Sequence, residues 1–407
     1  MAHIEGIRIQ NFRALKDLTL GKTFENQKPE PLPRLTALIG PNGSGKSTLM
    51  DAFGFIGDCL SFGVEEACDQ PHRGGFERLR TRGQLSPMQF EIYYRQEVNS
   101  RPISYSLHID MDSSGRPFVA YERLRQRRKG QSRGQPYSFL EVNNAQGYAW
   151  AGDATENEEG SNKVDVRLED PRRLGITTLG NLAEHPRIVA FREFLEGWYL
   201  SYFVPDLARG LPMAGAQKHL NRKGDNLANY VQFMERQHSS EFEEVLTRIA
   251  KKIPGIQKIG SKRADDGRLL LEFNDRGYVD PFYSQDMSDG TLKMFAYMLL
   301  LEDPVPAPLI GIEEPENGLH HQLLEPLAKE MKRYAHQPNG AQIIITTHAP
   351  YFVDALKPDD VWILEKDDNG FSTAVLAATI SSVNDLYQEG IPLGSLWYSN
   401  HFGRGNP

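Results

Sequence analysis

The sequence predicts an α/β fold that combines a parallel sheet with an antiparallel one, and three observations support this prediction. After Gly290 the chain alternates helical segments with short apolar runs, which is typical of parallel strands joined by right-handed crossovers. Near the amino terminus, the apolar run RLTALIG ends in a glycine and precedes a helical segment at 49–60. Between Gln89 and Trp150 apolar and polar residues alternate, which indicates an antiparallel meander.

The remaining elements follow from the same periodicities. The first twenty residues alternate apolar and polar positions and break at Asn11–Arg13, which predicts two short strands. Apolar residues recur at helical spacing in 181–203 and in 225–252. After Gly290 we expect helices at 291–301 and 319–336 and strands at 309–313 and 342–347.

Composition excludes several classes of protein. The 407 residues include 46 basic and 54 acidic side chains, and a net charge of -8 argues against a protein that coats nucleic acid through its overall field. No apolar stretch reaches the roughly 18 residues of a membrane helix. Two cysteines, Cys59 and Cys68, are too few for a disulfide framework, so we expect a cytoplasmic protein with no membrane contact.

A phosphate-binding motif occupies Gly40–Thr48, where GPNGSGKST fits G-x-x-x-x-G-K-[ST] between a strand and a helix. Its backbone N–H groups would face one centre at the amino end of the helix, which favours the phosphates of a nucleoside triphosphate. The alternative is a glycine-rich turn without a ligand, which the strand–helix context disfavours. The predicted nucleotide-binding residues are Asn42, Gly43, Ser44, Gly45, Lys46, Ser47 and Thr48, with Ser47 also a ligand of Mg²⁺.

Two adjacent carboxylates follow the apolar run LIGI, so a buried strand would deliver Glu313 and Glu314 to its carboxyl end. We assign Glu313 to the metal and Glu314 to the orientation of the attacking water. A solvated acidic loop is the alternative. The run QIIITT ends at His348, which we predict contacts the γ-phosphate as a second catalytic residue; the alternative is a purely structural histidine.

The order and spacing of these motifs resemble the SMC/RecF-like branch of the ABC ATPases, and most of all the stand-alone AAA-type ATPases related to the OLD family. The resemblance rests on Gly40–Thr48, Met287–Thr291, IEEPENGLHH and TTHAP. It implies an ABC-type P-loop ATPase head with a mixed sheet, an antiparallel β lobe and an inserted helical region, using ATP and Mg²⁺.

The resemblance also implies a signature loop at Met287–Thr291. Ser288 and Gly290 would then cap the γ-phosphate bound to the opposite subunit, so that ATP joins two copies into a homodimer. Asp289 replaces a glycine of the common signature. The same residues also fit a helix amino-cap at Ser288, and the two roles are compatible.

Three further positions come from the resemblance. A glutamine that senses magnesium is expected where the first lobe meets the second, and Gln89 is the candidate, with a surface strand residue as the alternative. Arg13 matches an arginine that contacts nucleotide in related heads, with an ordinary surface arginine as the alternative. His321 stands where many relatives have proline, and the sequence offers no interpretation of this change.

We expect three segments along the chain. Residues 1–180 form a P-loop-containing amino-terminal lobe with the antiparallel meander. Residues 181–280 form a mainly helical insertion. Residues 281–407 form a carboxy-terminal lobe with the signature loop, the acidic strand end and the histidine loop.

Three functions fit these features. The first is an ATP-driven switch that controls a separate effector protein, a nuclease or toxin, in prokaryotic anti-phage defence; we favour it because the stretch after His348 is short for a nuclease domain of its own. The alternative is a DNA repair or replication ATPase that binds DNA or RNA through the basic cluster Arg123–Lys129, which also reads as a solvated hairpin edge. A scaffold without hydrolysis is disfavoured by the presence of Glu314 and His348.

Overall fold

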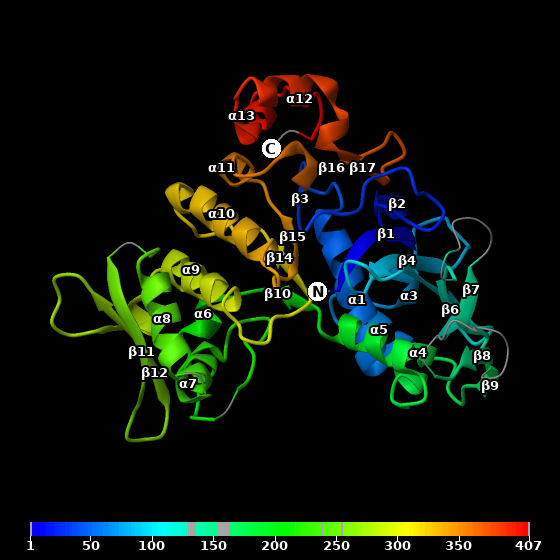
Figure 1. Ribbon diagram of the computed structural model, residues 1–407, viewed down its shortest axis with the longest axis horizontal. Coiled ribbons are helices and arrows are strands. Elements are labelled where there is room, and N and C mark those ends of the chain that lie inside the picture. Colours follow the sequence, from blue (N-terminus) through cyan, green and yellow to red (C-terminus); the bar gives the residue numbers. More distant parts are fainter. Residues whose placement is uncertain are drawn as a thin grey trace.

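The computed structural model describes residues 2–128, 130, 136–152, 163–215, 217–237, 239–253 and 255–405. Within them the chain forms an eight-stranded antiparallel sheet, a six-stranded mixed sheet and a small three-stranded sheet. Figure 1 shows the antiparallel sheet on one side of the molecule and helices α6–α9 with strands β11 and β12 on the other, with β3, β14 and β15 between them. Strand β3 from the amino-terminal part of the chain thus lies in one central sheet with β14 and β15 from the carboxy-terminal part.

The antiparallel sheet has the order β2-β1-β4-β5-β6-β7-β8-β9, so the predicted meander is confirmed and the first two strands extend it. Its inner face is apolar; Phe90 lies 5.6 Å from the ring of Phe55 on the helix that follows the P-loop. The strands are β1 (His3–Phe12), β2 (Leu15–Gly21), β4 (Met88–Arg95), β5 (Ile103–Met111), β6 (Pro117–Gln126), β7 (Tyr137–Asn143), β8 (Gln146–Trp150) and β9 (Lys163–Arg167).

The six-stranded sheet has the order β10-β14-β15-β3-β16-β17, and its neighbours are parallel except for the last pair. Its central strands are apolar on both faces because each face supports a separate core. The predicted strands near 35, 309 and 342 are confirmed. The strands are β10 (Tyr199–Ser201), β14 (Leu309–Glu313), β15 (Gln342–Thr346), β3 (Leu35–Ile39), β16 (Val361–Lys366) and β17 (Ser372–Leu376).

Gln342 joins the two large sheets. Its fully buried side chain accepts a hydrogen bond from Ile4 N at 2.8 Å and donates one to Ile4 O at 2.9 Å. A buried amide is stable only when its polar atoms are paired, so this contact fixes β1 against β15.

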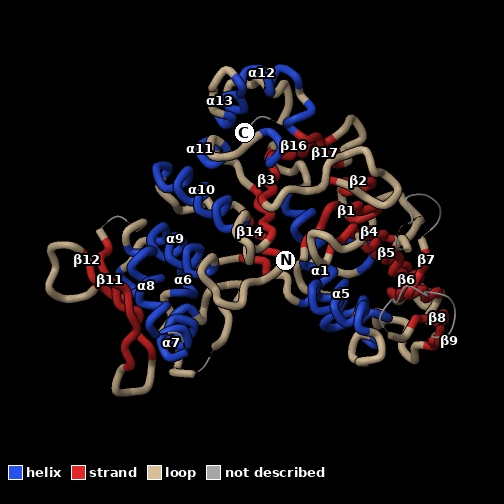
Figure 2. Tube along the Cα trace, viewed as in Figure 1, coloured by secondary structure: helices blue, strands red, loops and turns tan. Residues whose placement is uncertain are grey.

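Helices cover both faces of the central sheet, as Figure 2 shows in blue. On the side of the antiparallel sheet lie α1 (Lys46–Phe62), α2 (Val64–Cys68), α3 (Phe76–Leu79), α4 (Gly175–Leu179) and α5 (Pro186–Glu196). The others are α6 (Pro205–Ala208), α7 (Leu227–Gln237), α8 (Ser239–Ala250), α9 (Asp289–Leu300), α10 (Leu324–Ala335), α11 (Pro350–Val353), α12 (Ser381–Gln388) and α13 (Leu393–Tyr398). No described helix has the length and apolar character needed to cross a membrane.

Two expectations about the middle of the chain need correction. The helix expected over 181–203 ends at Glu196, since the chain turns at Gly197 and then enters β10, which pairs with β14 at the edge of the central sheet. The segment 181–280, expected to be mainly helical, also contains the antiparallel strands β11 (Ile256–Arg263) and β12 (Leu269–Asp275). A short strand β13 (Phe282–Tyr283) completes that small sheet.

A buried carboxylate lies inside the antiparallel lobe. Glu122 on β6 is fully buried and accepts hydrogen bonds from Gly175 N at 2.5 Å and from the Tyr105 hydroxyl at 2.9 Å. Burial raises the pKa of Glu122 to about 7, because the charged form loses its hydration. The folded protein therefore holds this proton more tightly than the unfolded chain does.

This raised pKa predicts a pH-dependent stability. The contribution of Glu122 is fully present below the unfolded pKa near 4.5 and is lost as the pH rises through about 7. We expect the difference in unfolding free energy between the wild type and Glu122→Gln to fall by about 3 kcal/mol from pH 4.5 to pH 8, measured by urea denaturation. Glu97→Gln, in an exposed turn, is the control. A difference that stays constant with pH would contradict the prediction.

Candidate functional site

The P-loop forms an open cradle between β3 and α1. Gly43 and Gly45 have left-handed backbone conformations, with φ of 77° and 107°, which side-chain-bearing residues rarely adopt. A Cβ at Gly43 would meet no atom within 4 Å, so the space above the loop is open. The Ser44 hydroxyl is buried with no hydrogen-bond partner in the described structure. An open loop at the amino end of α1 with an unpaired buried hydroxyl fits a phosphate chain.

Lys46 supplies the positive charge of this cradle. Its ammonium donates to the carbonyl oxygens of Gly40 at 2.7 Å and Pro41 at 3.1 Å, so the side chain lies folded over its own loop. Burial lowers the pKa of Lys46, while the nearby carboxylates of β14 and the loop after it raise it. In this structure the two carbonyl oxygens take the hydrogen bonds of the ammonium that phosphate oxygens would accept if a nucleotide were bound.

Ser47 and Glu313 are brought together, as the sequence predicts. Glu313 is the last residue of β14 and accepts a hydrogen bond from Ser47, the second residue of α1. Burial raises the pKa of Glu313, and the neighbouring Glu314 adds to this effect. A hydroxyl and a carboxylate in contact form a donor set that Mg²⁺ accepts, so these two residues fit the metal.

Glu314 has an unusual backbone and a firmly held side chain. Its φ is 44°, in the left-handed region, and its N–H donates to Thr346 O at 2.9 Å. One carboxylate oxygen accepts from the Asn317 amide at 2.7 Å, and the other lies 3.7 Å from His348 Nε2. Strained backbones of this kind persist where the surrounding structure over-determines them, and they cluster at functional sites.

His348 follows β15 and faces the same carboxylate. Its backbone N–H donates to Glu316 Oε1 at 2.5 Å, which fixes the loop after the strand. Burial and the charge of Lys46 lower the pKa of His348, so the imidazole is neutral at physiological pH. The structure therefore places Lys46, Glu313, Glu314 and His348 at one edge of the central sheet.

Arg13 lies beside the helix that follows the P-loop. Its guanidinium pairs with Asp51 at 3.0 Å and donates to His72 O at 3.3 Å. Asp51, one turn beyond Ser47, also pairs with the buried Arg73 at 2.9 Å. Asp51 and Arg73 were missed in the sequence because their pairing joins segments that carry no motif.

Gln89 is not brought to the metal ligands. It lies on β4 between Gln10 and His108, on the face opposite Phe90, which packs toward α1. Because side chains alternate along a strand, Gln89 points away from α1 and the P-loop. The residue beside Glu313 is Tyr202, directly after β10. Burial, with a smaller effect from the nearby carboxylates Glu313 and Asp51, raises the pKa of Tyr202 to about 12.

The predicted signature loop begins α9. Ser288 is the amino-cap and accepts from Thr291 N at 3.2 Å, so the helix-cap interpretation is confirmed. A Cβ at Gly290 would lie 2.8 Å from Gly318 O, which requires glycine there. Lys293 donates to Asn317 O at 2.7 Å, and this contact links α9 to the loop that holds Glu314. The nucleotide contacts of Ser288 and Gly290 remain predictions.

His321 and the basic cluster lie elsewhere. His321 stacks between His320 and Tyr351, with ring centroids 4.2 Å and 5.6 Å away. In the basic cluster, Arg125 pairs with Glu25 at 2.9 Å and lies over the ring of Phe24. Lys129 lies outside the described residues.

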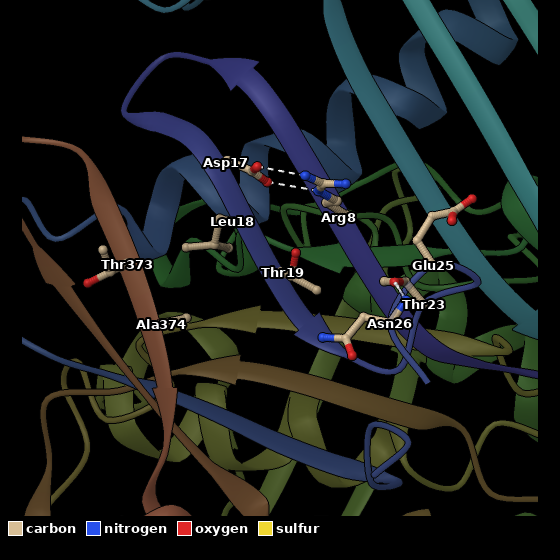
Figure 3. Close-up of a pocket in the computed structure, with 9 residues that line it drawn as sticks. All are labelled: Arg8, Asp17, Leu18, Thr19, Thr23, Glu25, Asn26, Thr373 and Ala374. Atoms are coloured by element: carbon tan, nitrogen blue, oxygen red, sulfur yellow. Dashed lines mark hydrogen bonds and ion pairs between the residues drawn. The ribbon is translucent and has the colours of Figure 1, made fainter. Parts of the chain in front are cut away.

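A separate polar hollow of about 510 Å³ lies between the edge strands β2 and β17 (Figure 3). Its charged groups are already paired, since Arg8 contacts Asp17 at 2.7 Å and Glu25 contacts Arg125. The rest of its lining consists of Leu18, Thr19, Thr23, Asn26, Thr373 and Ala374. These pairings leave the prediction that the nucleotide binds at the P-loop unchanged.

The family of the chain follows from comparison with known proteins. A family model described as "AAA domain, putative AbiEii toxin, Type IV TA system" matches residues 35–354. The chain belongs to this family. The matched range includes the P-loop, the predicted signature loop, the acidic strand end and His348, and it leaves out Arg13.

Solved structures show the same fold. The structure superposes on an SmcHead bound to the C-winged helix domain of ScpA with a TM-score of 0.53 and 15% identity, covering 92% of this chain and 97% of that one. For the Pyrococcus furiosus Smc head domain with an extended coiled coil, bound to the C-terminal domain of ScpA, the TM-score is 0.50, with 15% identity, 95% of this chain and all (100%) of that one. The fold is that of an SMC head, consistent with an ABC-type P-loop ATPase.

Curated relatives match over a short stretch. Structural maintenance of chromosomes protein 1B of Homo sapiens is 41% identical over 56 residues, which is 14% of this chain and 4% of that protein. The protein of the same name from Mus musculus is 39% identical over 56 residues. The match thus spans a small part of these relatives. The relation to the OLD family remains a prediction.

The position of Lys46 leads to a binding test. Lys46→Ala removes the only ammonium that the P-loop motif contributes, so we expect ATP affinity to fall at least about tenfold, measured by calorimetry. Lys329→Ala, on the exposed surface of α10, is the matched control and should bind as the wild type does. Unchanged affinity in Lys46→Ala would show that the P-loop does not bind the phosphates.

Proposed function

We propose that this protein is an ATP-hydrolysing switch whose two copies close around ATP and control a separate effector protein in prokaryotic defence. The observation that carries the proposal is the convergence of Lys46, Glu313, Glu314 and His348 at one edge of the central sheet, where Glu314 and His348 lie 3.7 Å apart. A P-loop opposite a strand that ends in carboxylates is the arrangement that phosphoryl transfer to water requires.

Each residue has a distinct part in this proposal. The P-loop N–H groups and Lys46 bind the phosphates. Ser47 and Glu313 would hold Mg²⁺, which supplies charge neutralisation during the reaction. Glu314 orients the attacking water and accepts its proton at a carboxylate oxygen. The neutral His348 donates a hydrogen bond from its imidazole toward the γ-phosphate or toward Glu314.

Asn317 is a positioning residue in this arrangement. Its amide holds one oxygen of Glu314 at 2.7 Å, and its carbonyl accepts from Lys293 of α9. The signature helix and the carboxylate therefore share a connection within one chain. This link supports a proposal in which closure of the dimer and hydrolysis influence each other.

The partner assignments rest on the family. The family description includes the words "putative AbiEii toxin, Type IV TA system", and this supports a function within a toxin–antitoxin system. The two Smc heads were solved with domains of ScpA bound, which supports a head of this fold as a surface for partner proteins. The direct DNA-binding alternative is less favoured, because Arg125 in the basic cluster is already paired with Glu25.

The catalytic assignment is tested with Glu314→Gln. Glutamine keeps the shape of the side chain but cannot accept the proton, so we expect ATP turnover to fall at least about a hundredfold while ATP binding persists. ATP-bound dimers should accumulate, as measured by light scattering after size exclusion. Glu325→Gln, exposed on α10, is the matched control. Turnover at the wild-type rate in Glu314→Gln would contradict the role of Glu314.

The partner assignment is tested by recovering the native complex. We expect the untagged protein, isolated from its own host with and without ATP, to carry a nuclease or toxin in one nucleotide state, identified by mass spectrometry. DNA should stimulate turnover less than about twofold if the effector is the physiological partner. Strong stimulation by DNA together with loss of salt-resistant protein partners would favour the repair function instead.

A further inference from the structure

The predicted signature loop contains a carboxylate in an unfavourable place. Asp289 lies between Ser288 and Gly290, the residues expected to face a triphosphate, and 56% of its side chain is exposed. A negative charge beside phosphate oxygens is repulsive, because like charges brought together at an interface weaken binding. The loop must therefore neutralise this carboxylate in order to bind phosphate.

Arg209 provides the opposite charge. Its guanidinium forms an ion pair with Asp289 and donates to Met287 O at 2.8 Å, so it contacts the residues on both sides of Ser288. The second terminal nitrogen pairs with Asp206 at 2.6 Å. Only 22% of the Arg209 side chain is exposed, compared with 89% for Asp206, so the cation is held on the loop side.

The backbone of Arg209 is also bound by the segment before the signature loop. Gln285, before the signature loop, donates its side-chain amide to Arg209 O at 2.7 Å. Arg209 is the carboxy-terminal cap of α6, and α6 follows β10 and Tyr202 at the edge of the central sheet. The segment after β10 runs beside Glu313. Through Arg209, this segment is connected to the start of α9.

We propose that Arg209 is a positioning residue that neutralises Asp289 and fixes the Met287 carbonyl, so that this acidic signature loop accepts the triphosphate of a second copy. The inference rests on the proposed function, because the signature loop acts on a nucleotide bound to the partner. Arginine suits the role because its planar fork reaches a carboxylate and a carbonyl at once. Asp206 is dispensable in this scheme, since it is the exposed partner.

The test is a charge-compensation cycle in the full chain. Arg209→Gln leaves Asp289 uncompensated, so we expect the protein concentration for half-maximal ATP-dependent association to rise at least about tenfold. ATP affinity of the monomer should stay within about twofold, because the loop acts on the other copy. The double variant Arg209→Gln/Asp289→Asn should associate within about threefold of the wild type. Asp206→Asn is the control and should match the wild type.

The outcomes separate this inference from the proposed function. Association of Arg209→Gln at the wild-type concentration overturns the inference alone. A double variant as defective as Arg209→Gln also overturns it, because the arginine would then act by structure and not by charge. A wild type that fails to associate with ATP and Mg²⁺ overturns the proposed dimer, and this inference falls with it. Thermal unfolding of each variant shows whether the fold is kept.

Discussion

The candidate site depends on the parallel alignment of β14, β15 and β3. Parallel strands end at the same edge of a sheet, so the P-loop after β3, the carboxylates after β14 and His348 after β15 must converge. These segments lie at opposite ends of the chain, and the pairing closes a very long loop. The buried amide of Gln342 supports this closure, because its hydrogen bonds with Ile4 attach the first strand of the antiparallel sheet to β15.

Charge balance is the second requirement of the site. Lys46 and the carboxylates of Glu313 and Glu314 meet in partly buried surroundings, where unpaired charges are costly. Lys46 is satisfied by the carbonyls of its own loop. On the next turn of α1, Asp51 is paired with Arg13 and Arg73. Hydrogen bonding and ion pairing thus prepare the edge of the sheet for a highly charged ligand.

The sequence predicts the parts of this structure whose residues carry a local pattern. The strand and helix that flank the P-loop, the meander and the strands before Glu313 and His348 are confirmed, because each pattern lies within one element. Strand β10 is too short to show a period and looked like the end of a helix. Gln89 has the chemistry of a metal ligand, but its position in the alternation of β4 turns it away from α1. The pairs Arg209–Asp289 and Asn317–Glu314 depend on close approach of side chains in the folded protein, and the spacing of residues along the sequence does not predict such contacts.

The backbone conformation of Glu314 lowers the stability of the fold while the side chain supplies a carboxylate to the candidate site. A φ of 44° disfavours any residue with a Cβ by roughly 1 kcal/mol, so glycine at this position would relax the turn after β14. A chain with glycine at position 314 would have a larger free energy of unfolding but would lack the carboxylate. Under the proposed function, glutamate in this turn gives up some stability in exchange for the carboxylate that orients water, so a stabilising substitution at position 314 would cost activity.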